Sequence, residues 1–315
     1  LQVIYHASFA SSITTPETIA KDAKDLASTI DIMINQTENA QLDEYPSPTR
    51  TIPKGHDITP AGLAVGLTLL ENDKYQAITT VDCISHLLRT QSPNKVTAVQ
   101  IANKQIMNWV KKSILRTNRL DGRRDVFKFF VNTAEECRKL NNFSSMAAVV
   151  VALESTTLAR LYIENLFKKL ATYVDPAGNH QAYRSLLSQR NNGPCVPWLP
   201  IHLKDMSSIQ RSMPKVVERD GLSLINFERH FRVLKAVDTA LSFKNGAYNF
   251  ETSRYSVPLA YLESELANVR VDDATDMGFE ERSLDLKTQE DKIFEDRLLE
   301  LQAVGFGSKN SQPKV

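Results

Sequence analysis

Residues with the chemistry for catalysis or metal binding occur in this chain, but not at the spacings that such chemistry requires. The six histidines form no H-E-x-x-H pair, and no G-x-S-x-G sequence offers an activated serine. No G-x-x-x-x-G-K-[ST] loop is present, whose backbone N–H groups and lysine would hold nucleotide phosphates. The sequence therefore gives no support to a hydrolase, a metalloenzyme or a GTPase, and we expect neither a cofactor nor a bound metal.

Composition indicates a globular chain whose partner is not selected by bulk charge. The 315 residues are 42% hydrophobic and 24% charged, with a formal net charge of +1. Binders of nucleic acid or of anionic membranes usually carry a basic stripe, and no apolar run approaches a membrane span. We therefore expect no nucleic-acid partner and no direct membrane segment, with any membrane recruitment supplied by regions outside this chain.

Cysteine usage indicates a reducing, cytoplasmic location. Cys83, Cys137 and Cys195 are widely spaced and odd in number, with no C-x-x-C pair. This pattern favours neither a disulfide framework nor a zinc site.

The segment 194–232 is the most informative part of the chain. Pro194 and Pro197 favour an extended backbone, so Trp198 lies on a stiff segment. A helix is expected to begin after it, near His202, and to end before Pro214. Apolar residues then recur near helical spacing, which predicts a second helix docked on a core. The two helices would form a hairpin with a polar tip. The apolar residues of the second helix are Leu222, Ile225, Phe227, Phe231, Leu234 and Val237.

Helical periodicity also dominates the remaining sequence. Residues 126–140 keep a 3, 4, 3, 4 rhythm of apolar positions, and 96–115 form a comparable segment around Trp109, which we assign to the core. No segment shows a convincing two-residue alternation bounded by turn residues, so we expect no sheet to organise the fold. The predicted class is all-α.

Three parts of the chain are expected. Residues 1–57 hold an amphipathic helix that starts at Thr15-Pro16, followed by a proline-rich linker. Residues 58–288 form the main domain, and 289–315 form a charged helix with a disordered tail. The first residue, Leu1, suggests a fragment of a longer protein.

Several motifs occur together in a recognisable order. They are ITPAGLAVGLTLLENDKYQAI from Ile58, NNFSSMAAVVVALESTTLARL over 141–161, the 194–232 segment, and ERSLDLK ending at Lys287. This collinear set resembles the catalytic domain of Ras-family guanine nucleotide exchange factors (RasGEF). The resemblance implies a helical domain with a protruding helical hairpin and a Ras-superfamily small GTPase of Ras, Rap or Ral type as partner in signal transduction.

The resemblance also implies a mechanism without covalent chemistry. An exchange factor speeds GDP release because it binds the nucleotide-free GTPase better than the loaded one. The inserting helix would be 201–213, which displaces switch I and Mg²⁺. The implied catalytic residues are Met206, Ser207, Gln210 and Arg211. The implied GTPase-binding residues are Trp198, Ala147, Glu154, His180, Lys204 and Arg232.

Three residues depart from the family pattern. Family members often have an acidic residue where Arg211 stands, and a cation cannot pair with the phosphate-loop lysine of a GTPase. Glu154 replaces an amide, so it can only accept hydrogen bonds when ionised, and His180 stands where Asn-Tyr is frequent. Phosphate mimicry is therefore not expected, whereas steric displacement of switch I is. Each departure would shift or narrow the choice of GTPase.

Simpler interpretations stand beside these roles. Trp198 would also suit a core position, Arg211 a solvated helix face and Glu154 a water-facing helix edge. Arg232 would also suit pairing within the hairpin, with Glu218, Asp220 or Glu228. The alternative function is a catalytically inactive RasGEF-fold scaffold that binds a GTPase or a signalling adaptor.

Overall fold

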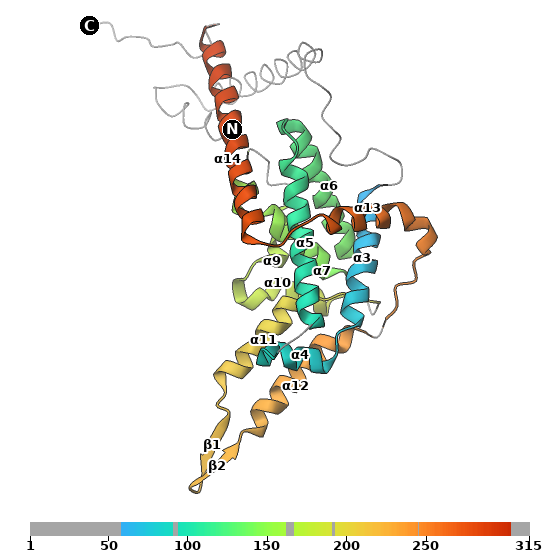
Figure 1. Cartoon of the computed structure of the whole chain (residues 1–315), viewed down its shortest axis with the longest axis vertical. Helices are drawn as coiled ribbons and strands as arrows, with labels where there is room; N and C mark the ends of the chain where they lie inside the picture. The colour runs from blue at the N-terminus through green and yellow to red at the C-terminus, as the bar shows by residue number, and fades with distance from the viewer. Residues whose placement is uncertain (1–57, 91–93, 162–166, 191–192, 245, 304–315) are drawn as a thin grey trace, which may run out of the picture. The chain divides into compact units, whose positions relative to one another are not determined.

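The protein is described from a computed structural model, shown in Figure 1. The predicted N-terminal helix and linker, in residues 1–57, and the predicted tail after residue 303 lie outside the described residues. The chain divides into two compact units, Leu1–Thr49 and Arg50–Val315, and all described residues belong to the second. The described residues are 58–90, 94–161, 167–190, 193–244 and 246–303.

Helices build this unit, as the periodicity predicts, and the all-α class is confirmed. In chain order the elements are α3 (Pro60–Gln76), α4 (Thr80–Leu88), α5 (Lys95–Leu115), α6 (Leu120–Lys139), α7 (Phe143–Leu153), α8 (Thr156–Ala159), α9 (Lys168–Val174), α10 (Ala177–Ser188), α11 (Leu199–Ser212), β1 (Val216–Arg219), β2 (Leu222–Ile225), α12 (Phe227–Leu241), the 3-10 turns η1 (Ser242–Lys244) and η2 (Thr252–Tyr255), α13 (Ser256–Ala267) and α14 (Asp273–Ala303).

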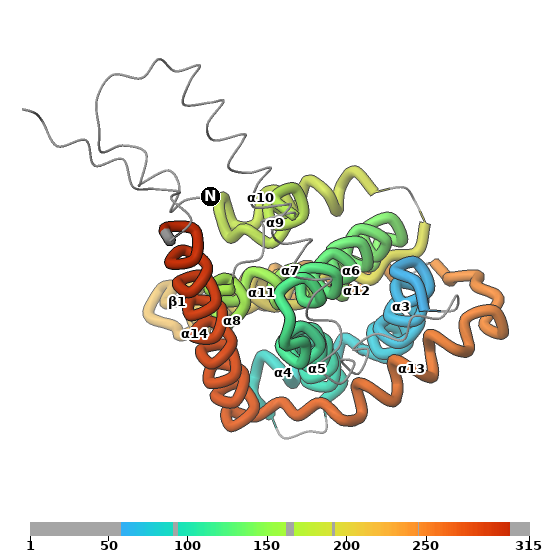
Figure 2. The backbone as a smooth tube through the Cα atoms, turned by 90° about the horizontal axis from the view of Figure 1, so that it is seen from above, coloured from blue at the N-terminus to red at the C-terminus, as the bar shows by residue number. Residues whose placement is uncertain are grey.

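The core lies where α3, α5 and α6 surround α7. Helix α7 is buried almost all round, which is why its sequence is apolar without a polar face. Trp109 on α5 is fully buried, as predicted, and its ring meets that of Phe130 edge-on at 5.0 Å between centroids. Viewed from above in Figure 2, α13 passes along one side of this helix group and α14 along another.

Side-chain caps fix where the helices begin. Thr59 accepts from the Gly62 N–H ahead of α3, and Thr79 forms a capping box with Asp82 ahead of α4. Asn142 accepts from the Ser145 N–H and caps α7.

Helix α14 crosses the predicted end of the main domain without a break. It runs from Asp273 to Ala303 and therefore passes straight through residue 288. Buried Arg123 of α6 forms an ion pair with Glu290, so α14 is anchored to the body beyond that residue. The boundary after residue 288 stays a prediction.

The expected helical hairpin is present, but a two-stranded ribbon replaces its polar tip. Strands β1 and β2 pair antiparallel, with Val216 opposite Ile225, and every residue of both strands is exposed. Asp220 and Gly221 join the strands with φ values of 53° and 76°. Two positive φ angles in a two-residue loop are typical of a type I′ turn, which Asp-Gly favours. The second helix therefore begins at Phe227, and the prediction that it starts near Leu222 is wrong.

The apolar stripe predicted to dock α12 on a core is mostly exposed. Phe227, Phe231 and Leu234 have 77%, 63% and 44% of their surface accessible, whereas Val233 and Val237 are buried. The prediction misjudged the helix phase because it joined strand residues and helix residues into one period. We call α11, the ribbon and α12 together the lever, residues 199–241; in Figure 1 the ribbon forms its far end.

Candidate functional site

The lever is joined to the body at the start of α7. The N–H groups of Phe143 and Ser144 donate to the Val196 carbonyl at 2.9 and 3.2 Å, and the Val196 N–H donates to the Asn141 carbonyl at 3.0 Å. The two longest motifs of the sequence therefore meet at one backbone bridge. The orientation of α11 is tied to the most deeply buried helix of the domain.

Trp198 occupies a core position at the root of α11. Its side chain is 9% exposed, and its ring meets His180 and Tyr183 edge-on at centroid distances of 5.3 and 5.6 Å. The Trp198 N–H donates to the Tyr183 hydroxyl at 2.9 Å. Only a narrow edge of the indole is left for contact with a partner.

His180 lies in a strained turn beside Trp198. Gly178, Asn179 and His180 have φ values of 57°, 56° and 59°, so three successive residues are left-handed. This conformation costs roughly 1–2 kcal/mol for each residue other than glycine. His180 is 8% exposed, and its Nδ1 has no hydrogen-bond partner among the described residues. Burial lowers the pKa of His180, and the positive charges of Lys204 and Arg184 lower it further.

Three of the predicted site residues share the outer face of α11. Lys204, Ser207 and Arg211 follow at i, i+3 and i+7, which places them on one side of the helix. Lys204 and Arg211 are exposed, while Ser207 is half-buried. Gln210 is also half-buried, and its backbone carbonyl accepts from the Arg229 guanidinium of α12. The outer face is thus polar and carries two cations.

Two other predicted site residues have no accessible surface. Met206 and Ala147 are 0% exposed and belong to the hydrophobic core. In this conformation neither can touch a partner directly. Any effect of these residues on a partner would pass through the packing beneath α11 and within α7.

Glu154 and Arg232 are both exposed. Glu154 is the C-cap residue that directly follows α7, and partial burial raises the pKa of its carboxyl, with Asp175 adding to the rise. Arg232 donates to Glu228 at 2.6 Å within α12, as the simpler interpretation of this cluster expected. With more than half of each side chain exposed, this pair contributes little stability.

The far end of the lever is held together by Asn226 and Arg229. Asn226 is 8% exposed, accepts from the Arg229 N–H at 3.2 Å as the cap of α12, and donates to the Pro214 carbonyl at 2.9 Å. The Arg229 guanidinium donates to the Gln210 carbonyl near the end of α11 at 3.3 Å. These bonds join the two helices and the ribbon into one piece.

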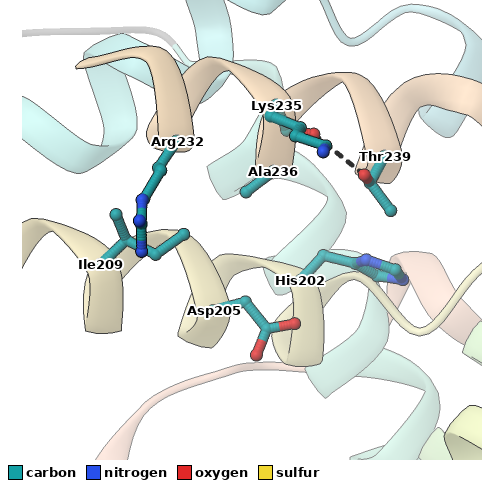
Figure 3. Close-up of a pocket in the computed structure, with 7 residues that line it drawn as sticks. All are labelled: His202, Asp205, Ile209, Arg232, Lys235, Ala236 and Thr239. Carbon is teal, nitrogen blue, oxygen red and sulfur yellow. Dashed lines mark hydrogen bonds between the residues drawn. The ribbon is translucent and has the colours of Figure 1, made fainter. Parts of the chain in front are cut away.

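A shallow groove of about 360 Å³ runs between the two lever helices. Figure 3 shows His202, Asp205 and Ile209 of α11 on one side and residues of α12 on the other, with Arg232 extending across. Burial lowers the pKa of His202 to about 4, an effect that Asp205 opposes and Arg184 reinforces. His202 is therefore neutral near pH 7.

The structure describes residues 58–90, 94–161, 167–190, 193–244 and 246–303. Within them, no three His, Cys, Asp or Glu side chains converge into a group that could hold a metal ion. None of the described helices has both the length and the apolar character that crossing a bilayer requires. Cys83, Cys137 and Cys195 are all buried and unpaired thiols.

The fold is a helical body that carries a two-helix lever, and the outer face of α11 on this lever exposes Lys204 and Arg211. The RasGEF domain model matches residues 62–231, which is 170 of the 315 residues. The chain belongs to the RasGEF domain family.

Proteins similar to this chain are named as a cell division control protein or as guanine nucleotide exchange factors. Cell division control protein 25 of Saccharomyces cerevisiae is 30% identical over 228 residues, which cover 68% of this chain and 14% of that protein. Guanine nucleotide exchange factor SDC25 of the same species is 30% identical over 221 residues, or 62% of this chain and 18% of that protein. Ras guanine nucleotide exchange factor J of Dictyostelium discoideum is 26% identical over 204 residues, which cover 60% of this chain and 24% of that protein. The chain thus spans less than a quarter of the length of these relatives.

Proposed function

We propose that this chain is a guanine nucleotide exchange factor that promotes GDP release from a Ras-like small GTPase. Membership of the RasGEF family supports the class of activity, and the names of three relatives include exchange or cell-division control. The observation that carries the proposal is the lever: a rigid two-helix element, anchored on the core at its root, with the outer face of α11 accessible.

The energetics require a lever of this kind. Nanomolar to picomolar nucleotide affinity corresponds to about 12–16 kcal/mol. An exchange factor offsets this only if part of its interface forms when the GTPase is empty, because equal binding to both states changes nothing. A standard interface of roughly 1,600 Å² is large enough to supply the difference. The lever would displace switch I and Mg²⁺ and thereby stabilise the vacant nucleotide site.

The predicted residues divide into two groups by burial under this proposal. Lys204, Ser207 and Arg211 touch the GTPase directly, because they share the accessible face of α11. Exposed Glu154 and Arg232 take contacts at the margins of the interface. The remaining predicted residues support the face from below or present only an edge, namely Met206, Gln210, Trp198, Ala147 and His180.

Release of a fluorescent GDP analogue tests the proposal. Ras, Rap and Ral GTPases are loaded with the analogue and mixed with this chain, with a Rho-type GTPase as the comparison. We expect at least one of the first three to release nucleotide faster. Arg211→Glu should raise that rate, because it removes a cation that repels the phosphate-loop lysine of the GTPase and supplies a carboxylate that can pair with it. Arg254→Glu, an equal change at an exposed residue of η2, should not. Unchanged release from every GTPase tested would rule the proposal out.

A second candidate is an inactive scaffold with the same fold. Exposed Arg211 favours it, because a cation at this place repels the phosphate-loop lysine of a GTPase. Tight binding to a nucleotide-free GTPase without faster release would support the scaffold. The choice of Ras, Rap or Ral as partner is a prediction that the same panel of GTPases tests. The cytoplasmic location is a prediction that imaging of the tagged full chain tests.

A further inference from the structure

We propose that Arg184 and Asp205 are positioning residues that set the direction of the lever. Neither residue belongs to the contact surface described above, and the inference rests on the proposed exchange function for its catalytic consequence. Arg184 lies on α10 and Asp205 on α11, so the pair joins the body to the lever.

The contact between the two side chains is bidentate. Arg184 Nη1 donates to Asp205 Oδ2 at 2.9 Å, and Nη2 donates to Oδ1 at 2.8 Å. Two parallel bonds between a planar guanidinium and a carboxylate fix the angle between the groups as well as their distance. About a third of each side chain is exposed, so the pair is held mainly by this geometry and little by burial.

The same guanidinium also holds the strained turn. Arg184 Nε donates to the Asn179 carbonyl at 2.8 Å, within the left-handed segment that ends at His180. His180 in turn meets the ring of Trp198, the residue ahead of α11. One side chain therefore reaches the lever by two routes, directly through Asp205 and indirectly through the turn and Trp198. A backbone in a disfavoured conformation persists only when its surroundings hold it there.

A small rotation at the N-terminal end of α11 produces a larger displacement at its C-terminal end, where Arg211 lies. Arg211 lies twelve positions after the first residue of the helix, Leu199, which is roughly 18 Å at 1.5 Å per residue. A rotation of about 5° at the root would move the end by roughly 1.6 Å on this length. Misplacement of a catalytic group by about 1 Å can lower a rate by up to a hundredfold. The ion pair between Arg184 and Asp205 thus controls the position of the C-terminal end of α11, to which the exchange rate is sensitive.

Replacement of Arg184 by lysine distinguishes a positioning role of the guanidinium from an effect of its positive charge alone. Arg184→Lys keeps the positive charge near Asp205 but loses the fork and the Nε bond to Asn179. Arg138→Lys is the matched control, because Arg138 makes a bidentate pair with Glu135 of similar exposure within α6. Asp205→Asn is the second variant; it keeps the side-chain shape and removes the charge.

The first measurement follows the lever without any GTPase. Spin labels at Ser223→Cys on β2 and Lys128→Cys on α6 report the distance from ribbon to body in the full chain; both positions are exposed, and the three native cysteines are buried. We expect a narrow distance distribution in the parent chain and in Arg138→Lys, and a broadened or shifted one in Arg184→Lys and Asp205→Asn. An unchanged distribution in both of these variants would overturn the inference.

The second measurement uses the GTPase that responds to the parent chain. We expect Arg184→Lys to lower kcat for exchange about three- to tenfold with KM changed less than twofold, and Arg138→Lys to leave both unchanged. A loss confined to KM would overturn the inference, because it would make Arg184 a binding residue. If the parent chain accelerates no GTPase, the proposed function fails, while the distance measurement still decides the positioning role.

Discussion

Replacement of Trp198 by alanine should destabilise the whole domain. The indole is 9% exposed, packs edge-on against two rings and lies in the hydrophobic core. Removal of a buried Trp side chain costs about 3–5 kcal/mol, and each aromatic pair contributes about 0.5–1.5 kcal/mol beyond its buried area. The bond from the Trp198 N–H to Tyr183 survives because it belongs to the backbone. We therefore expect a loss near 4 kcal/mol.

Thermal unfolding followed by circular dichroism measures this loss. For a domain of this size each kcal/mol lowers Tm by roughly 2–4 °C, so Trp198→Ala should unfold about 8–16 °C below the parent chain. Leu222→Ala, at a 63% exposed position of the ribbon, is the control and should stay within about 0.5 kcal/mol. A Tm for Trp198→Ala equal to that of the parent would refute the core placement and return Trp198 to the interface. Trp198→Phe keeps an aromatic ring beside His180 and Tyr183, so its Tm should lie between that of Trp198→Ala and that of the parent chain.

Three further perturbations probe the lever. Asn226→Ala removes the α12 cap and the bond to Pro214, so hydrogen exchange should quicken at residues 227–230 by an amount equivalent to about 1–2 kcal/mol, while the Tm of the body stays nearly constant. The pKa of His202 is lowered to about 4 from an ordinary 6.5, so the unfolded chain takes up this proton first; stability should fall by about 1–3 kcal/mol between pH 6.5 and 4, and urea titrations of His202→Gln should show a smaller fall. Arg232→Ala breaks an exposed pair and should change stability by less than about 0.5 kcal/mol, so a loss of exchange in that variant would report contact with the GTPase, and a large drop in Tm would contradict the assignment.

The helices of the body could be predicted because local signals and core packing agree there. Periodic apolar residues over 96–115 became α5 with Trp109 at its centre, and the Asn-Asn-Phe turn became the cap of α7. The ribbon was missed although Asp220-Gly221 is a strong hairpin signal. The four-residue strand β2 lies just before helix α12, so the apolar spacings of the two together mimic one longer helix. The positive φ angles of Asp220 and Gly221 distinguish a hairpin ribbon from that longer helix.

The sequence could single out α11 as the candidate contact helix, but not the burial of its side chains. Motif similarity singled out α11, and the structure exposes Lys204 and Arg211 on its outer face. Burial depends on packing from distant segments, so sequence alone could not assign Met206 and Ala147 to the core. Residues such as Arg184 were missed because their partners lie on other elements, 21 positions away in the case of Asp205.

Exchange activity requires that this chain bind a GTPase with an empty nucleotide site more tightly than a loaded one. Biolayer interferometry with an immobilised GTPase from the responsive subfamily measures the Kd of this chain twice, once for the nucleotide-free form in EDTA and once for the GDP-loaded form with Mg²⁺. We expect binding at least a hundredfold tighter to the empty form, equivalent to about 2.7 kcal/mol of differential affinity. Equal affinity for the two forms, or tighter binding to the loaded one, would contradict it.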